Sequence, residues 1–168
     1  ENITVADKAR CFYKSDLDGL QDIINVNINY FGQEPLDIGH QTWNGGRIIT
    51  FALINSNLTK LPENIGRLTS LQNLHLDNNV LQSLPENIGN LENLTELVLD
   101  ENQIKILPNT FCNLNNLRGL SMDNNQLITL PDNFGNLKNL KELYLNYNQI
   151  KHLPESFGNL ENLEILLI

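Results

Sequence analysis

The chain has 168 residues, a length that suits one domain with a substantial hydrophobic core. Its formal net charge of −9 and pI near 4.7 argue against binding to nucleic acid or to an anionic membrane surface, because both require clustered Lys and Arg. Two cysteines are too few for a disulfide scaffold, and no apolar run approaches the ~20 residues of a membrane-spanning helix.

The first 47 residues show no repeat, and their first half favours a helix. Residues 4–24 read TVADKARCFYKSDLDGLQDII, in which Leu20 and Ile24 fall on one helical face. Ser15 followed by Asp18 resembles an N-terminal capping pattern. We therefore predict a helix over residues 4–24.

The rest of this segment favours extended structure. Residues 24–31, INVNINYF, alternate apolar side chains with Asn, which predicts a half-buried strand. Asn44-Gly45 lies between extended flanks and indicates a tight turn. Residues 1–47 are therefore expected to form a mixed α/β unit of their own, since a separate catalytic domain would need more residues.

Residues 48–168 consist of repeats. Five full copies begin at residues 48, 71, 94, 117 and 140, and a partial sixth begins at 163, so that each copy starts 23 residues after the last. The copy LTELVLDENQIKILPNTFCNLNN is typical. Its pattern of Leu at the first, fourth and sixth places predicts a short strand that buries its leucines only when neighbouring copies stack.

The pattern L-x-x-L-x-L-x-x-N-x-L-x-x-L-P resembles the leucine-rich repeat family over residues 48–168. The resemblance implies an α/β solenoid with a curved parallel β-sheet on its concave face, covered at its start by an N-terminal cap formed by residues 1–47. The copies look most like the Leu-Pro-x-x-Ile/Phe-Gly subgroup of bacterial surface or secreted proteins and of plant and animal signalling scaffolds. That likeness implies an extracellular or cell-surface location.

Two further columns of the repeat carry structural expectations. In the family, an Asn where each strand turns away forms a hydrogen-bond ladder with the backbone, and Ser56 at the first such place predicts a weaker ladder there. A Gly near the end of each copy suggests a tight bend with positive φ, and Cys112 replaces it in one copy. Cys112 is interpreted as a small tolerated substitute, and it is expected to stay unpaired with Cys11. The Asn ladder consists of Asn79, Asn102, Asn125 and Asn148.

The resemblance implies non-catalytic recognition of another protein through the concave face. Side chains beside the buried leucines are exposed there, and their acidic centre favours a partner with a basic patch. Tyr144 and Tyr147 are the best candidate anchors, because aromatic residues dominate interface hot spots. The predicted face comprises Thr50, Ala52, Asn73, His75, Asp77, Glu96, Val98, Asp100, Glu101, Ser121, Asp123, Glu142, Tyr144, Asn146 and Tyr147.

Other kinds of function remain as alternatives. The chain contains no catalytic, phosphate-binding or zinc-binding motif, so we expect no catalytic residues, no cofactor and no metal site. A carbohydrate- or ion-binding surface is the main alternative, with Trp43 as a further exposed aromatic platform and the stacked Asp77, Asp100 and Asp123 as a conceivable cation site. The second alternative is that the chain is a regulatory repeat fragment of a larger enzyme or receptor.

The last six residues, LEILLI, open the sixth copy. Leu163, Leu166 and Ile168 are expected at core positions, and Leu167 beside them. An uncovered end of the stack would offer apolar side chains and an unpaired strand edge. We therefore predict self-association through Leu163, Leu166, Leu167 and Ile168, giving a homodimer through the C-terminal end.

Overall fold

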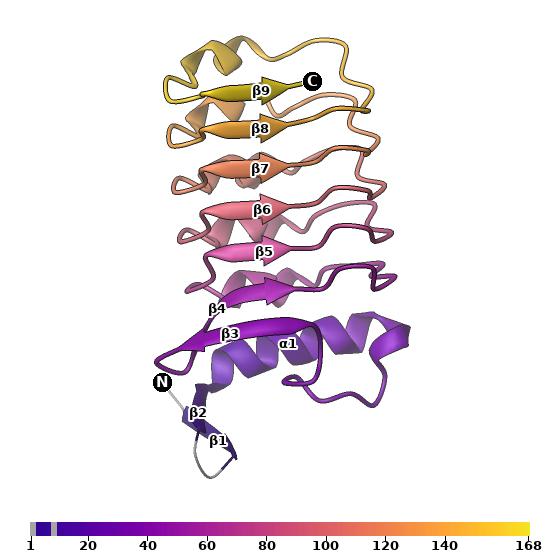
Figure 1. The fold of residues 1–168 in the computed structure, drawn as a ribbon, viewed down its shortest axis with the longest axis vertical. Helices are drawn as coiled ribbons and strands as arrows, with labels where there is room; N and C mark the ends of the chain where they lie inside the picture. The colour runs from indigo at the N-terminus through magenta and orange to yellow at the C-terminus, as the bar shows by residue number, and fades with distance from the viewer. Residues whose placement is uncertain (1–2, 8–9) are drawn as a thin grey trace.

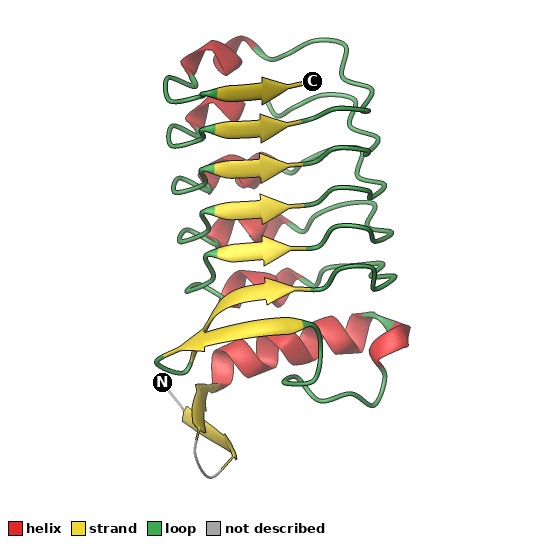
Figure 2. Cartoon of the chain, viewed as in Figure 1, coloured by secondary structure: helices red, strands yellow, loops and turns green. Residues whose placement is uncertain are grey.

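The computed structural model describes residues 3–7 and 10–168, with side chains from Phe12 onward. Seven strands form one sheet in chain order, and a short 3-10 helix (η) follows each strand from β4 to β8 on the other side of the stack (Figures 1 and 2). The two termini lie at opposite ends of the stack. None of the described helices combines the length and hydropathy needed to cross a lipid bilayer.

The elements of the structure are β1 (Ile3–Asp7), β2 (Arg10–Tyr13), α1 (Lys14–Val26), η1 (Ile28–Tyr30), β3 (His40–Asn44), β4 (Arg47–Ala52), η2 (Glu63–Arg67), β5 (Asn73–His75), η3 (Glu86–Asn90), β6 (Glu96–Val98), η4 (Asn109–Asn113), β7 (Gly119–Ser121), η5 (Phe134–Asn136), β8 (Glu142–Tyr144), η6 (Glu155–Asn159) and β9 (Ile165–Leu167).

The predicted 23-residue register is confirmed in the sheet. From β4 to β9 every pair of neighbours is parallel, and each residue pairs with the residue 23 positions later, as Leu74 does with Leu97. The leucines at the first, fourth and sixth places of the interior copies are buried, as Leu94, Leu97 and Leu99 show. Each coil therefore completes its core only against its neighbours.

The predicted Asn ladder is also confirmed. The Asn102 side chain accepts a hydrogen bond from the Leu81 N–H of the preceding coil and donates to the Leu76 carbonyl of that coil. It also donates to the Leu99 carbonyl of its own coil. Asn79, Asn125 and Asn148 repeat this pattern, so each Asn satisfies backbone groups on two successive coils. The Ser56 hydroxyl donates to the carbonyl of Ile54 in its own coil and bridges no second coil, which confirms a weaker first position.

The glycine column is tight for a different reason from the one predicted. None of its glycines has positive φ, so the predicted left-handed bend is wrong. A Cβ atom on Gly89 would clash with the Thr110 carbonyl oxygen, and one on Gly135 would clash with that of Ser156. The next coil's backbone passes so close that a side chain does not fit.

Cys112 occupies the place of glycine in its coil, and the repeat helix of the next coil starts later than the others. In the register of the other glycines, its Cβ atom faces Asn133. Here η5 begins at Phe134, two residues later in its coil than the other repeat helices, and Asn133 stands outside it. Cys112 is a free, buried cysteine, and burial raises the pKa of its thiol to about 11. The thiol therefore stays protonated and unreactive, as a small substitute for glycine would. The side chain of Cys11 lies outside the described residues.

The cap differs from the predicted helix over residues 4–24. Strands β1 and β2 form an antiparallel hairpin, and α1 begins only at Lys14, with Tyr13 as its N-cap. The predicted capping interaction of Ser15 is absent, since its hydroxyl bonds to Asp16 instead. The β-branched residues of ITVAD favour a strand, and a paired partner strand outweighs the weak helical pattern before Lys14.

The strand predicted over residues 24–31 is wrong as well. Helix α1 continues through Val26, and η1 follows. Asn27 between them is buried, and its side-chain oxygen accepts hydrogen bonds from the Thr59 and Lys60 N–H groups, while its amide donates to the Lys60 carbonyl. Asn27 thus serves the first coil as the ladder asparagines serve later coils. The turn predicted at Asn44-Gly45 is confirmed, with Asn44 paired to Arg47 across Gly45 and Gly46.

A buried ion pair joins the cap to the repeats. Asp16 of α1 is fully buried, and its carboxylate binds the Arg47 guanidinium through two contacts of 3.0 Å. The same carboxylate accepts the Ile48 N–H at 2.9 Å, at the start of the first copy. The Arg47 guanidinium also lies over the Tyr13 ring, 4.9 Å from its centroid. The proposed boundary between cap and repeats at residue 47 falls inside β4.

We predict that Asn102→Ala lowers the free energy of unfolding by about 3 kcal/mol or more, because it leaves several buried backbone groups unpaired at about 1–3 kcal/mol each. Ser56→Ala is the control and is expected to cost less than about 1 kcal/mol, since it removes one exposed bond. Urea unfolding followed by circular dichroism measures both. Equal losses in the two variants would contradict a structural role for the ladder.

We predict that Asp16→Ala costs about 3–5 kcal/mol, the usual effect of breaking a buried ion pair. Asp18→Ala is a matched control on the same helix, because it breaks the exposed Lys14–Asp18 pair, and it should cost less than about 0.5 kcal/mol. Thermal and urea unfolding of the two variants test this difference. A stable Asp16→Ala protein would show that the cap docks without the ion pair.

Candidate functional site

The sheet has one face turned away from the 3-10 helices, which we call the open face and which corresponds to the predicted concave face. Strand residues alternate between the core and this face, as Leu74 is buried while Asn73 and His75 are half-buried. The predicted strand residues on this face are at least partly exposed, and those after the strands lie in the following turn. The structure thus gathers the predicted binding residues along one face of the sheet.

The aspartate column at the strand ends is held by the next coil. Asp100 accepts hydrogen bonds from the Ser121 hydroxyl at 2.6 Å and from the Asp123 N–H at 2.7 Å. Asp123 accepts the Asn146 N–H in the same way. Burial raises the pKa of Asp100, and the negative charges of Asp123 and Asp77 add to this to a smaller extent. The two hydrogen bonds lower the pKa and offset part of the rise. These carboxylates therefore stabilise the turn, and the cation site considered from the sequence gains no free ligands from Asp100 or Asp123.

The column after the aspartates has left-handed backbone. Asn55, Asn78, Glu101, Asn124 and Tyr147 all have positive φ, between 52° and 56°. Asn tolerates this conformation, whereas a residue such as Tyr or Glu adopts it at a cost. The Tyr147 side chain is 81 % exposed. The chain thus holds a large aromatic side chain in water, at a position where Asn would fit the backbone better.

Two glutamates on the open face are engaged by neighbours. The Glu142 carboxylate accepts a hydrogen bond from the Tyr144 hydroxyl at 3.1 Å, and this bond raises the pKa of Tyr144. Glu96 Oε1 lies 3.4 Å from His75 Nε2, close enough for an ion pair when the imidazole is protonated. That Nε2 atom is buried and has no partner with hydrogen-bond geometry, so we regard the contact as a charge interaction rather than a hydrogen bond.

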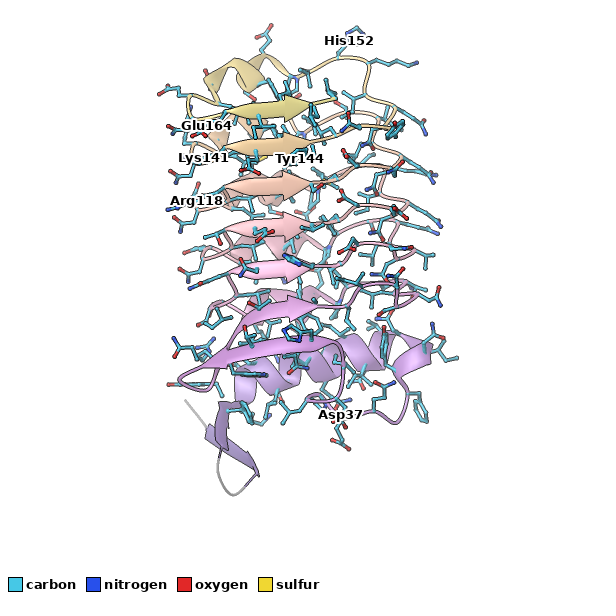
Figure 3. The ribbon with its side chains drawn as sticks, in the orientation of Figure 1. Asp37, Arg118, Lys141, Tyr144, His152 and Glu164 are labelled. Carbon is cyan, nitrogen blue, oxygen red and sulfur yellow. The ribbon has the colours of Figure 1, made fainter. Side chains whose placement is uncertain are left out.

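Sequence reasoning missed the cationic edge of the open face. Arg118 and Lys141 precede β7 and β8, and Figure 3 labels them with Glu164 along the edge where the strands begin. Arg118 and Lys141 line an open hollow of about 430 Å³ on this face. The signal was present in the register, because these residues directly follow the first buried leucine of their copies. The hollow is lined by Thr95, Glu96, Arg118, Gly119, Lys141 and Glu142.

The aromatic platform suggested at Trp43 is engaged in packing. Its ring packs edge-on against Phe12, with the centroids 4.6 Å apart, and its indole N–H donates to Gln41. The half-buried Trp43 therefore supports the cap. Of the three histidines, only His75 lies on a repeat strand, as the register predicts.

The C-terminal strand is in the predicted register but is uncovered. Leu166 pairs with Leu143, yet it is 38 % exposed, and Ile168 is 58 % exposed. Leu163 is partly buried against the core. The edge of β9 is the last in the sheet and has no strand partner among the described residues.

Stacked parallel strands backed by short helices, with one coil per 23 residues, define an α/β solenoid repeat protein. Models of the leucine-rich repeat family match residues 50–124, 116–137 and 130–168. The chain belongs to the leucine-rich repeat family. A comparison with curated protein sequences found no match.

Two similar solved structures have the same fold. A leucine-rich repeat protein of Leptospira interrogans is 36 % identical over 70 % of this chain, with a TM-score of 0.67. The plant peptide hormone receptor RGFR1, in complex with RGF2, is 34 % identical over 67 % of this chain, with a TM-score of 0.58. The chain spans 32 % and 18 % of the lengths of these two proteins.

We predict that Tyr147→Asn raises the free energy of unfolding by about 1 kcal/mol, because Asn adopts positive φ more readily and the exposed ring contributes little packing. The reverse change one coil earlier, Asn124→Tyr, is the control and should lower it by a similar amount. Urea unfolding measures both. A loss of stability in Tyr147→Asn would show that the ring packs more than its exposure indicates.

Proposed function

We propose that the chain recognises another protein through the open face of its sheet and performs no catalysis. Proteins with this fold generally act as binding scaffolds, and the similar plant receptor was solved in complex with RGF2. The observation that carries the proposal is Tyr147, an exposed aromatic residue held in a strained backbone conformation. Strain of this kind gathers at functional sites, and aromatic residues dominate interface hot spots.

The charges of the open face support a partner with basic groups. Glu101 is exposed in the turn after β6. The half-buried Asp77 and Asp100, which follow β5 and β6, add further negative charge. The chain as a whole carries a formal charge of −9. Acidic surfaces of this kind speed association with basic partners and weaken as salt rises.

We also propose a subgroup within the family and a division of the chain into a cap and repeats. We propose that the chain belongs with bacterial surface or secreted repeat proteins of the Leu-Pro-x-x-Ile/Phe-Gly subgroup, and the likeness to a leucine-rich repeat protein of Leptospira interrogans supports the bacterial part of this proposal. The division into a cap at residues 1–47 and repeats at residues 48–168 is supported by the cap helix α1 and the ladder role of Asn27. Carbohydrate binding has less support, because Trp43 packs against Phe12.

We predict that replacing Tyr144 and Tyr147 together with Ala weakens partner binding by more than about 2 kcal/mol, because Tyr144 lies on the open face and Tyr147 is exposed in the turn after the same strand. The partner would first be captured from the source organism by a photoreactive residue at Ser121, with the same residue at Asn136 on the helix side as the control. Titration calorimetry then compares the variants.

The matched control for the tyrosines is Ile106→Ala with Ile128→Ala. These two residues are 60 % and 49 % exposed. They lie in the loops that connect β6 to η4 and β7 to η5, not on the strands of the open face. Their removal should leave binding unchanged. Normal binding by the tyrosine variant together with lost binding by the isoleucine variant would place the interface elsewhere.

We propose in addition that, in this 168-residue form, β9 pairs with a second copy of the chain. Leu166, Leu167 and Ile168 are exposed there beside an unpaired strand edge, and such edges associate with other chains. A two-fold axis would place two β9 strands side by side and close both edges.

We predict that the 168-residue chain sediments as a dimer and that Leu166→Lys with Leu167→Lys converts it to a monomer, because charged side chains would then face each other across the edge. Sedimentation equilibrium over a range of concentrations measures the change. A wild-type chain that stays monomeric at high concentration would rule out this interface.

A further inference from the structure

Gly119 leaves the open face hollow at the start of β7. Its register neighbours are Glu96 on β6 and Glu142 on β8, both of which carry long side chains. A Cβ atom on Gly119 would meet only the Glu96 Cγ atom, at 4.0 Å. The strand therefore has room for a larger residue here, although glycine weakens strands through its backbone entropy and lack of packing.

The repeat glycines behave differently. At Gly89 and Gly135 the next coil's carbonyl oxygen occupies the space of a Cβ atom, so the fold itself requires glycine. No backbone approaches Gly119 in this way, and its φ is not positive. A glycine that neither sterics nor backbone conformation requires marks a place where another molecule can approach the strand closely.

The two glutamates beside the hollow already have contacts toward the other end of the strands. Glu142 accepts the Tyr144 hydroxyl, and Glu96 lies 3.4 Å from His75 Nε2. Tyr144 and His75 are the last residues of β8 and β5. These contacts draw both carboxylates away from the edge where the strands begin.

At that edge the hollow has an unpaired cation. Lys141 pairs with Glu164 at 2.6 Å, in an exposed ion pair of the kind that contributes little. Arg118 lines the same hollow, and among the described residues its guanidinium has neither an ion pair nor a hydrogen bond. A guanidinium binds carboxylates through two parallel hydrogen bonds, which a lysine does not offer.

We propose that the hollow over Gly119 binds the carboxylate of an Asp or Glu side chain from a partner segment that crosses the open face, with Arg118 as its cationic contact. This inference rests on the proposed function. Strands β6 and β8 continue the face on both sides of the hollow, so an internal residue of a passing chain can reach it. The partner segment then combines one acidic residue here with basic groups opposite Glu101.

The test uses peptides selected from a random dodecapeptide phage library on the 168-residue chain. Selected peptides should share one acidic position, and replacing that residue with Asn or Gln should weaken binding about tenfold or more. Arg118→Gln should weaken binding of the original peptide by the same factor. Arg67→Gln, an exposed arginine of η2 on the helix side, is the matched control and should change nothing.

Gly119→Val separates binding from folding. A Cβ atom at this position meets no backbone, and valine favours the strand and narrows the hollow, so the melting temperature should stay equal or rise while peptide binding falls about tenfold or more. Peptides with an amidated C-terminus should bind as well as free peptides. If amidation alone abolishes binding, the hollow takes a C-terminal carboxylate and the side-chain assignment is wrong.

The remaining outcomes distinguish the two proposals. Peptides that bind Arg118→Gln and Gly119→Val like the wild type, yet lose affinity for the variant with Ala at Tyr144 and Tyr147, would overturn the carboxylate site and leave recognition by the open face intact. Selection of no peptide, or of peptides insensitive to all these changes, would count against both.

Discussion

The structure depends on the sharing of backbone hydrogen bonds between successive coils. A strand of three residues and a single turn of 3-10 helix cannot satisfy their own polar groups or bury their own leucines. Asn102 solves the first problem, because its amide fixes the strand's exit turn and bonds to the coil before it, and stacking of the coils solves the second. Asn27 of the cap bonds in a comparable way to backbone groups of Thr59 and Lys60 in the first coil. The stack is therefore stable only as a series.

Because the inward and turn positions are used for stacking, the outward strand positions are free to serve another purpose. Leu97 and Leu120 fill the same core place in successive coils, whereas Val98 and Ser121 beside them differ in chemistry. Tyr147 and Gly119 each fit the local backbone less well than another residue would. Asn adopts the positive φ of position 147 more readily, and position 119 has room for a side chain that would favour the strand. Positions that the scaffold does not require, or that cost it stability, are where we place recognition.

The repeats could be predicted from the sequence because their contacts recur at a fixed spacing. The buried leucines follow from the period and the ladder from the resemblance to the family, but the reason for the glycine column follows from neither, since it depends on a carbonyl of the next coil near Gly89. The cap has no period to guide prediction. Its hairpin and the Asp16–Arg47 ion pair depend on partners far apart in sequence, and the alternation around Asn27 reflected a buried polar contact rather than a strand. The cationic edge was missed because only positions beside the strand leucines were considered.

The proposed function requires that a partner covers the open face near its C-terminal strands. Hydroxyl-radical footprinting of the chain with and without its captured partner tests this most directly, because Tyr147 is 81 % exposed and Phe31, in the cap, is 91 % exposed. The two aromatic rings report on opposite ends of the molecule in one experiment. The partner should reduce oxidation of the Tyr147 ring and leave oxidation of the Phe31 ring unchanged. Protection of Phe31 with full oxidation of Tyr147 would contradict it.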